Sequence, residues 1–334
     1  MNRGLASATR RDGPGHDGIN PNAAYPPRMR IALTGVSGFI GSHLARRLAE
    51  QGHKVSGLVR ETSNWQAVQP YCDRLTFGDQ ADETRWHELL EGCDCVIHNS
   101  VDWEAIRPGY KQRGGMRRHL LNNLVGSIRL LECSNPRQFI FVSTIAVYHD
   151  ILPRWQGRPD ETHPTRPATP YGAYKAAVEA HLWAECFGRD RNTSAVRPCA
   201  VYGMDPRLDR TIGYSIIREI EAERKFSKRG GGKFVHVDDV TAAVAALVGN
   251  QNARGHAYNL VDCYARWADW AAIAADIMHI RPEIDMSSPP QPVNTFDTTE
   301  ARALPGVGLD RGHDGIRRHL EQLVLEMNNA GLIT

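Results

Sequence analysis

A tyrosine and a lysine four residues apart have the types and spacing of a proton-transfer pair. Tyr171 and Lys175 lie in the segment Tyr-Gly-Ala-Tyr-Lys, which is predicted to be helical, so both side chains share one helix face. A tyrosine hydroxyl has an unperturbed pKa of about 10 and needs help to exchange a proton at neutral pH. A neighbouring ammonium group favours the phenolate and lets the tyrosine act as an acid or a base.

A hydroxyl pair, Ser143-Thr144, ends the strand that precedes this helix. The run 139–142 is the most strand-like in the chain, and ligands of doubly wound folds bind at the carboxyl ends of the strands. There the Thr144 hydroxyl can hydrogen-bond a substrate oxygen that alternates between alcohol and ketone. Because Tyr-x-x-x-Lys spacing is common by itself, the placement of Thr144 is what indicates a catalytic site rather than a surface pair.

The segment Thr-Gly-Val-Ser-Gly-Phe-Ile-Gly (34–41) is a predicted phosphate-binding turn. It lies between a predicted buried strand, 31–34, and a predicted helix, 40–51. Its glycines allow a tight turn, close approach of a pyrophosphate and close helix–strand packing, and the helix N-terminus supplies N–H donors. This context distinguishes the turn from an ordinary glycine-rich loop. The residues expected to bind a dinucleotide here are Gly35, Ser37, Gly38, Phe39, Ile40 and Gly41.

Two further positions bear on the cofactor. The strand 54–59 is followed by Arg60, where an NAD-selective site would usually offer an acidic residue to the ribose. A guanidinium suits a 2′-phosphate instead, so NADP is the preferred cofactor and NAD the alternative, unless Arg60 is simply a solvated surface residue. Asp79 and Gln80 follow the third strand, where a loop can reach the adenine, although a plain turn explains the aspartate nearly as well.

Alternating strands and helices must position these residues. Strands are predicted at 31–34, 54–59, 75–77, 95–98, 139–142 and 194–197, and helices at 40–51, 86–90, 116–133 and 171–187. This alternation implies right-handed βαβ units and a parallel sheet. After Pro198 the rhythm breaks, with helices predicted at 212–223, 239–248 and 317–328, a strand at 257–260 and irregular structure over 282–305.

The predicted fold class is therefore α/β, a doubly wound parallel sheet (Rossmann fold) with a smaller interleaved C-terminal substrate lobe. We expect a flexible tail over 1–28, which lacks apolar periodicity, and a dinucleotide-binding core over 29–200. Residues 201–334 are expected to form mainly the substrate lobe, with 233–262 returning to the core.

The chain resembles the extended short-chain dehydrogenase/reductases, the NAD-dependent epimerase/dehydratase group, over about Met29 to Gly249. Besides the motifs above, the resemblance rests on the segments 122–126, 141–144 with 147–148, 197–198 with 201–203, and 234–240. It implies that Thr144, Tyr171 and Lys175 form a catalytic triad with Tyr171 as acid/base. It also implies a homodimer formed through 116–133 and 171–187. By the same resemblance the cofactor is lined by Asn99, Ser100, Val101, Asn122, Tyr171 and Lys175, with Pro198 and Cys199 near the nicotinamide.

Departures from the family pattern concern the substrate. Ala200 stands where many nucleotide-sugar members have an asparagine expected to contact the sugar phosphate. The stretch 204–233 is short and lacks the usual Gly-Asp-Gly-x-Gln-x-Arg-Asp segment, with Lys233 in place of its arginine. Four tryptophans are candidates to line a substrate cavity: Trp65, Trp103, Trp155 and Trp183. Trp103 is notable because it comes just after the cofactor loop. The alternative is that these side chains pack in the core or on the surface in the ordinary way.

The leading interpretation is an NAD(P)-dependent oxidoreductase that transfers a hydride at a secondary alcohol or ketone of a small molecule. One alternative is a nucleotide-sugar 4-epimerase, which uses the same triad through a transient ketone. A dehydratase would need an acid/base pair just after Thr144, where Ile145 and Ala146 stand instead. A non-catalytic NADP-sensing regulator would typically lack the Tyr/Lys pair, so its presence favours an enzyme.

Composition excludes several other classes. The 40 Lys+Arg and 38 Asp+Glu of the 334 residues give a net charge of +2, which predicts no nucleic-acid partner and no anionic membrane surface. Apolar runs are shorter than the roughly 20 residues of a membrane span, and the N-terminus lacks the apolar run of a signal peptide. Seven scattered cysteines without Cys-x-x-Cys predict neither a disulfide framework nor a bound metal, and fit a reducing cytoplasm.

Overall fold

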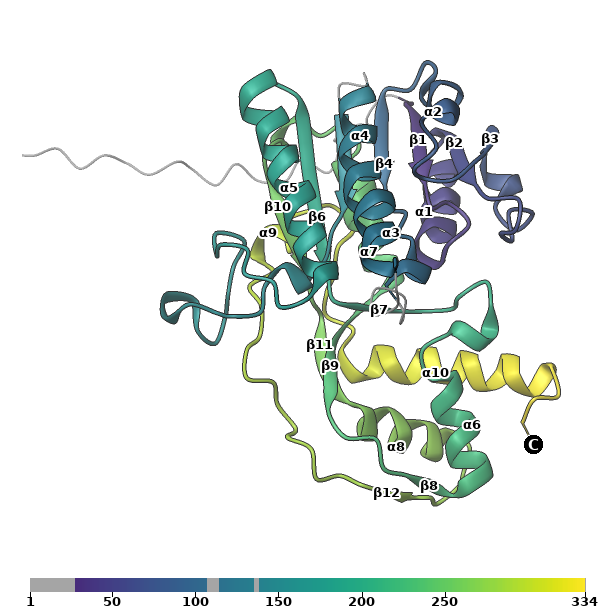
Figure 1. The fold of residues 1–334 in the computed structure, drawn as a ribbon. Coiled ribbons are helices and arrows are strands. Elements are labelled where there is room, and N and C mark those ends of the chain that lie inside the picture. The colour runs from purple at the N-terminus through teal and green to yellow at the C-terminus, as the bar shows by residue number, and fades with distance from the viewer. Residues whose placement is uncertain (1–27, 107–113, 135–137, 334) are drawn as a thin grey trace, which may run out of the picture.

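The computed structural model describes residues 28–106, 114–134 and 138–333, and within them a seven-stranded parallel sheet is the central layer (Figure 1). Its strand order is β10-β6-β5-β4-β1-β2-β3. Apart from residue 28, the predicted tail lies outside the described residues. The strands of this sheet are β1 (Arg30–Thr34), β2 (Lys54–Val59), β3 (Arg74–Phe77), β4 (Cys95–His98), β5 (Gln138–Val142), β6 (Asn192–Pro198) and β10 (Ala257–Leu260). The predicted strands all form, within two residues at either end.

Helices cover both faces of this sheet. Successive residues of a strand point to opposite faces, so Ile31 and Leu33 of β1 pack toward α1 (Phe39–Glu50) and α7 (Val237–Leu247). Ala32 packs toward α2 (Glu83–Leu90), α4 (Gly126–Cys133) and α5 (Pro170–Arg189). The core sheet is therefore doubly wound, as predicted, and the carboxyl ends of its parallel strands share one edge.

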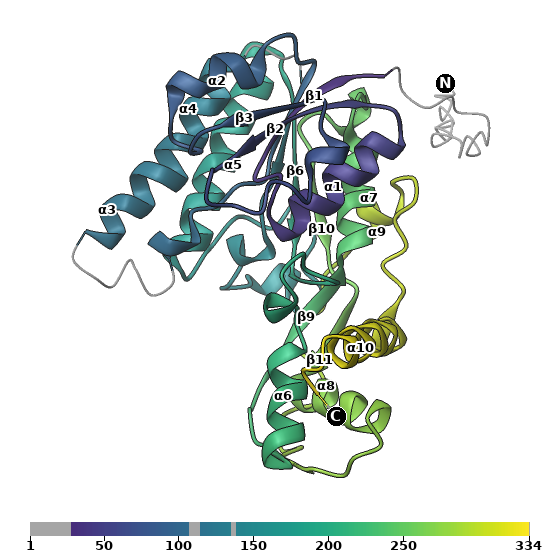
Figure 2. The same cartoon turned by 90° about the vertical axis from the view of Figure 1, so that its right-hand side faces the viewer.

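The second lobe packs three helices around a small sheet (Figure 2). Strand β9 (Gly231–His236) pairs parallel with β7 (Ala200–Tyr202) and antiparallel with β11 (Cys263–Arg266). The helices α6 (Tyr214–Glu223), α8 (Trp267–Ile277) and α10 (Gly312–Asn329) enclose a separate apolar cluster around Trp270. Two-residue strands β8 (Lys225–Phe226) and β12 (Glu283–Ile284) complete it. The short α9 (Thr299–Arg302) lies outside this lobe and packs against β10 of the central sheet.

The long helix predicted over 116–133 is interrupted. It begins as α3 (Gly115–His119), widens into the π-helical segment η4 (Leu120–Val125) and continues as α4. The widening accompanies side-chain bonds from Asn123 to His119 and to the backbone of Asp102. The predicted long helix is confirmed in its extent, and the π-helical turns within it are a local difference that the sequence did not predict, where hydrogen bonds to a distant loop accompany the wider helical spacing.

Late segments of the chain return to the first layer. Helix α7 packs against α1, where Arg47 donates to the Thr241 hydroxyl at 3.0 Å and to the Asp238 carbonyl. Strand β10 pairs in parallel with β6. Across the described ranges, no helix is long and apolar enough to cross a membrane.

Candidate active site

The glycine turn after β1 has the shape of a phosphate cradle. Gly35 has a φ of +67°, and a Cβ atom at Gly41 would lie 2.0 Å from the Gly35 carbonyl oxygen, so no larger residue fits either position without a backbone shift. Gly38 is the N-cap of α1, and no described side chain caps that helix. The N-terminal N–H groups of α1 thus point to a site suited to an anion.

A buried chain of hydrogen bonds ties the loop after β4 to this turn. The Thr34 hydroxyl oxygen accepts from the N–H groups of Asn99 (3.1 Å) and Ser100 (3.2 Å), so its own proton is donated to Nδ1 of His98 at 2.7 Å. His98 Nε2 then donates to Ser127 Oγ at 2.7 Å, and Ser127 donates onward to the Asn123 carbonyl. Burial lowers the pKa of His98 to about 3, which keeps the ring neutral.

This loop supplies a polar atom that still needs a partner. The Ser100 hydroxyl is buried and has no hydrogen-bond partner among the described residues. Its backbone lies directly against Gly35, where an added Cβ would meet Ser100 Cα at 2.8 Å. Val101 continues the same loop. An orphaned hydroxyl beside a glycine cradle and an uncapped helix start fits the pyrophosphate end of a dinucleotide.

Lys175 and Thr144 meet at the carboxyl end of β5. Lys175 is 1% exposed, and its Nζ donates to the Val142 carbonyl at 2.6 Å and lies 4.3 Å from the centre of the Phe141 ring. Burial lowers the pKa of Lys175 to about 7, against the opposing effect of the Glu179 carboxylate. Two residues beyond Val142, the Thr144 hydroxyl accepts from the Ala146 N–H at 3.1 Å.

The first turn of α5 packs closely against the turn that follows β5. The Thr169 hydroxyl caps the helix by accepting from the Gly172 N–H at 3.1 Å. A Cβ at Gly172 would lie 2.2 Å from the Ala146 carbonyl oxygen, so glycine is required for this approach. Tyr171, the residue before Gly172, therefore lies close to the turn that Thr144 begins and one helical turn before Lys175. The catalytic role of the three residues remains a prediction.

A buried ion pair between α5 and β6 supports the carboxyl end of β5. Glu179 accepts from the guanidinium of Arg197 on β6 at 2.6 Å and from the Ser143 hydroxyl at 2.5 Å. Arg197 also donates to the Tyr148 hydroxyl. These contacts join β5, β6 and α5. The sequence analysis did not identify Glu179, although its placement one turn after Lys175 on the same helix face was a usable signal.

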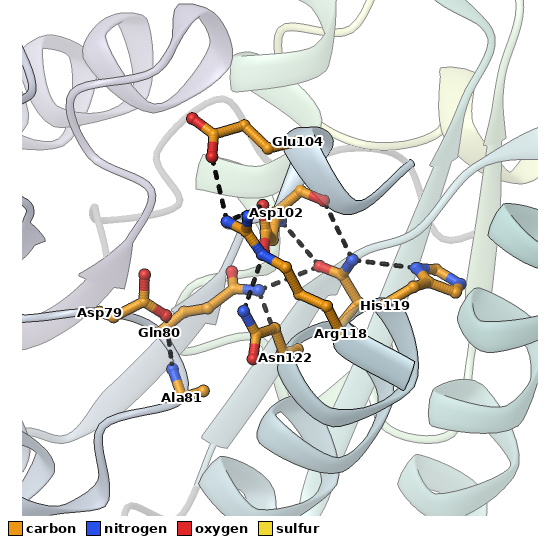
Figure 3. A network of polar contacts seen from close by, with 9 residues as sticks. Asp79, Gln80, Ala81, Asp102, Glu104, Arg118, His119 and Asn122 are labelled. Carbon is orange, nitrogen blue, oxygen red and sulfur yellow. Dashed lines mark hydrogen bonds and ion pairs between the residues drawn. The ribbon is translucent and has the colours of Figure 1, made fainter. Parts of the chain in front are cut away.

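The loop after β4 is held by a polar network at Asp102 (Figure 3). The Asp102 carboxylate accepts from Arg118 Nε (2.8 Å) and from the side-chain amide of Asn122 (2.8 Å). The Asp102 N–H donates to Asn123 Oδ1 at 2.7 Å, and Asn123 reaches His119, whose Nε2 lies 3.2 Å from the Pro170 carbonyl of α5. The network thus connects the loop after β4 with the helix that carries Tyr171.

The remaining predicted cofactor residues are placed as follows. Gln80 is buried and donates to the Asn122 carbonyl and to Asn123 Oδ1, so its amide supports the π-helical segment. The Asp79 carboxylate accepts from the Ala81 N–H in a local turn. Arg60 is exposed at the end of β2. Pro198, the last residue of β6, is buried. The N–H of Cys199, the next residue, donates to the Leu260 carbonyl at 3.1 Å.

A cavity of about 210 Å³ opens on the second-lobe side of the same sheet edge. Its walls include Lys233 of β9 and Phe296, and the Phe296 ring packs against Tyr148 with centroids 5.5 Å apart. Lys233 is half-buried, which lowers its pKa, and no carboxylate of a described residue forms an ion pair with it. The other lining residues are Arg158, Val261, Asp262, Cys263, Tyr264, Pro292, Thr295, Thr298 and Arg302.

Comparisons with known proteins identify relatives over most of the chain. The model of the NAD dependent epimerase/dehydratase family matches residues 31–260. YtcB of Bacillus subtilis (strain 168), an uncharacterized UDP-glucose epimerase, is 28% identical over 254 residues, covering 70% of this chain and 76% of that protein. A 4-hydroxy-2-methyl-3-oxo-4-farnesyl-3,4-dihydroquinoline-1-oxide ketoreductase of Stigmatella aurantiaca is 29% identical, covering 70% and 68%.

Solved structures agree with the fold. The crystal structure of a UDP-galactose 4-epimerase matches with a TM-score of 0.70 at 25% identity, covering 90% of this chain and all of that chain. The similarity therefore extends beyond residues 31–260 into the second lobe.

Proposed function

The chain belongs to the NAD dependent epimerase/dehydratase family, whose members are NAD(P)-dependent enzymes, and we propose that it transfers a hydride at a secondary alcohol or ketone of a small molecule. The observation that carries this proposal is the buried Lys175 amine, fixed to the carbonyl of Val142 beside Thr144 and one helical turn from Tyr171. A lysine without a chemical task is rarely buried to this extent.

We propose that the glycine turn, Ser100 and Arg60 hold the cofactor, with Asn99, Val101, Asn122, Pro198 and Cys199 lining it and Asp79 and Gln80 near the adenine. The uncapped start of α1 suits the pyrophosphate, and the exposed Arg60 guanidinium suits a 2′-phosphate, which favours NADP over NAD. When bound, the nicotinamide supplies or accepts the hydride.

The protein's own groups would handle the proton and the oxygen. In reduction, the Tyr171 hydroxyl donates its proton to the ketone oxygen, and the phenolate left behind favours the charged form of Lys175. In oxidation, the same phenolate removes the proton from the alcohol. The Thr144 hydroxyl hydrogen-bonds the substrate oxygen in both states and so keeps the reacting carbon in place.

Turnover of NADPH and NADH with a panel of ketones, alcohols and nucleotide sugars tests this function. We expect turnover of at least one ketone by the wild type and loss of that turnover in Tyr171→Phe. Cofactor binding without any turnover across the panel, together with equal behaviour of wild type and Tyr171→Phe, would favour the non-catalytic regulator instead.

A nucleotide-sugar 4-epimerase is the second candidate, because one similar structure is a UDP-galactose 4-epimerase and YtcB is described as a UDP-glucose epimerase. Ala200 opposes it, since β7 starts with a methyl group where an amide would meet the sugar phosphate. We therefore expect no conventional nucleotide-diphosphate sugar as substrate. Saturable binding of a UDP- or GDP-sugar with micromolar affinity, measured by calorimetry, would make the 4-epimerase the first candidate.

We also propose that two copies of the chain associate through the helices α3, η4, α4 and α5. Leu120, Leu121 and Val125 are 43–44% exposed on these helices, and Met116 is 39% exposed. Exposed apolar groups gathered on adjacent turns fit an interface between copies. Sedimentation of Leu121→Glu should give a monomer where the wild type gives a dimer.

The cysteine thiols bear on the compartment. All seven lie within the described residues and are free. This supports a reducing compartment, and we propose the cytoplasm.

A further inference from the structure

Trp103 lies face to face with the proposed acid/base. The rings of Trp103 and Tyr171 are stacked, with centroids 5.2 Å apart and planes inclined by 28°. Trp103 is 42% exposed, whereas Trp86 and Trp270 are buried in the two cores at 2% and 0%. A large indole left partly exposed beside a reacting hydroxyl offers contact area to whatever approaches that hydroxyl.

The backbone at Trp103 is held in place on both sides. The preceding residue, Asp102, is 7% exposed, and its carboxylate, N–H and carbonyl are bound by Arg118, Asn122 and Asn123 (Figure 3). Ala105, two residues later, is 1% exposed. The indole can therefore change position by rotating its side chain, but its attachment point is fixed relative to Tyr171.

The stack does not assist proton transfer directly. An indole ring carries no charge and no proton acceptor, so it cannot favour the phenolate form of Tyr171 as an ammonium group does. What it supplies is an apolar surface with a fixed attachment point, whose ring centroid lies 5.2 Å from that of Tyr171.

We propose that Trp103 determines substrate specificity by stacking an aromatic ring carried next to the reacting carbonyl or carbinol carbon. This inference rests on the proposed function of Tyr171. An aryl ring can pack against the exposed part of the indole by stacking or edge-to-face contact, in addition to the area that it buries. A sugar ring is less suited, because it presents hydroxyl groups rather than a flat aromatic face, and the Asp102 carboxylate next to the indole already accepts from Arg118 and Asn122.

The test compares acetophenone with cyclohexyl methyl ketone, which share the reacting group and differ in the flat ring. We expect wild type to favour acetophenone in kcat/KM by about tenfold. Trp103→Ala should lower this ratio at least about fivefold, through KM, with kcat changing less than about twofold. Trp103→Phe should keep most of the preference, and Trp103→Leu, apolar but not aromatic, should lose it. Leu325→Ala removes a 57% exposed apolar side chain from α10, outside the proposed site and the proposed dimer interface, and should leave the preference unchanged.

Direct binding separates this inference from the proposed function. Dissociation constants of acetophenone for the NADP-loaded wild type and Trp103→Ala, measured by ligand-observed NMR, do not require turnover. Weaker binding in the variant supports the stacking even if neither ketone is reduced, in which case only the proposed reaction fails. Equal dissociation constants overturn the stacking even if both ketones are reduced. A variant that loses UDP-glucose binding and keeps acetophenone binding also overturns it, because the ring would then serve a sugar.

Discussion

The carboxyl ends of β5 and β2 carry two halves of one proposed site in opposite physical states. At the end of β5, Ser143, Thr144 and Lys175 are 2%, 8% and 1% exposed, and each is hydrogen-bonded within the protein. At the end of β2, Arg60 is exposed, and within the described ranges no carboxylate pairs with its guanidinium. The side chains at the end of β5 are thus held by protein contacts without a ligand. The Arg60 side chain has no such contact with a carboxylate of a described residue and is available to a ligand.

This difference has consequences for function. Groups fixed in advance need no rearrangement during reaction, which is the condition for effective electrostatic stabilisation. They also carry stability, because removing one leaves a buried partner unsatisfied. An exposed arginine carries little stability and acts through selectivity alone. Substitutions at β5 should therefore change both folding and chemistry, and substitutions at β2 only the choice of cofactor.

The largest effect is expected for Glu179→Ala. This change leaves the Arg197 guanidinium, whose side chain is 4% exposed, without its carboxylate, and breaking a buried pair in this way costs about 3–5 kcal/mol. Urea denaturation measures the loss. Glu50→Ala breaks the exposed pair with Arg46 and should cost at most about 1 kcal/mol. Similar losses in both variants would show that the buried Glu179–Arg197 pair does not stabilise the carboxyl end of β5.

Tyr171→Phe should reduce turnover at least about 100-fold while leaving the fold and cofactor affinity intact, since general acid/base groups contribute on that scale. Lys175→Ala should be similarly severe, and Thr144→Val less so. Tyr174→Phe is the matched control, because it makes the same change three residues later at a buried hydroxyl that has no partner among the described residues. Near wild-type turnover in Tyr171→Phe would end the assignment of the acid/base.

The buried lysine also predicts how stability depends on pH. The pKa of Lys175 is about 7 in the folded protein and about 10.4 for a free lysine. Between these values the unfolded chain binds the extra proton, so the free energy of unfolding should rise with pH, by up to about 1.4 kcal/mol per pH unit.

Lys175→Met removes this contribution. The difference in unfolding free energy between wild type and variant, measured by urea denaturation from pH 7 to pH 9, should shift in favour of the wild type as pH rises. Lys54→Met, at an exposed lysine of β2, should leave the slope unchanged. A pH-independent difference for Lys175→Met would show that Lys175 binds its proton equally in both states.

Regular alternation made the first layer predictable from the sequence. Strands such as 54–59 and 95–98 were predicted with their observed bounds, because buried parallel strands are short apolar runs separated by amphipathic helices. The glycine turn was predictable for a related reason, since its spacing follows from local backbone geometry. Its role in cofactor binding remains a prediction.

The second lobe was harder to predict, for reasons that its elements make clear. The sequence does not predict helix α8, because its Ala- and Trp-rich segment is buried on most sides and lacks a clear polar face. Strands β7 and β11 have only three and four residues, and β9 begins with two glycines and a lysine. They form because β9 finds partners on both sides, which is a tertiary property.

Tertiary hydrogen bonds also explain what was missed at the site. The π-helical segment and the Asp102 network depend on side chains separated by about twenty residues, such as Asp102 and Asn123. Burial and the charge of Lys175 lower the pKa of His98, and the contact of its ring with Thr34 joins residues 64 positions apart. Sequence spacing contains neither contact.

The smallest predicted effect concerns the exposed region, and Arg60→Ala tests it. Arg60 can bind a 2′-phosphate through two charge-assisted hydrogen bonds, each contributing about 1.5–3 kcal/mol, so wild type should favour NADP(H) over NAD(H) by at least about tenfold. The neighbouring Ser63 hydroxyl donates to the Arg60 carbonyl at 2.6 Å, which leaves Thr62 as the hydroxyl available to assist. Removal of the guanidinium should bring the two affinities together without changing the free energy of unfolding.

Dissociation constants of both cofactors for wild type and Arg60→Ala measure this preference, with Arg46→Ala as the control at an exposed arginine of α1. An exposed guanidinium can instead stack on the adenine, which both cofactors share, and then its removal weakens both equally. Equal affinities in the wild type, or an unchanged ratio in Arg60→Ala, would show that Arg60 does not recognise the phosphate. In that case the β2 end would differ from the β5 end in lacking any selective role, and the choice of cofactor would have to come from another part of the site.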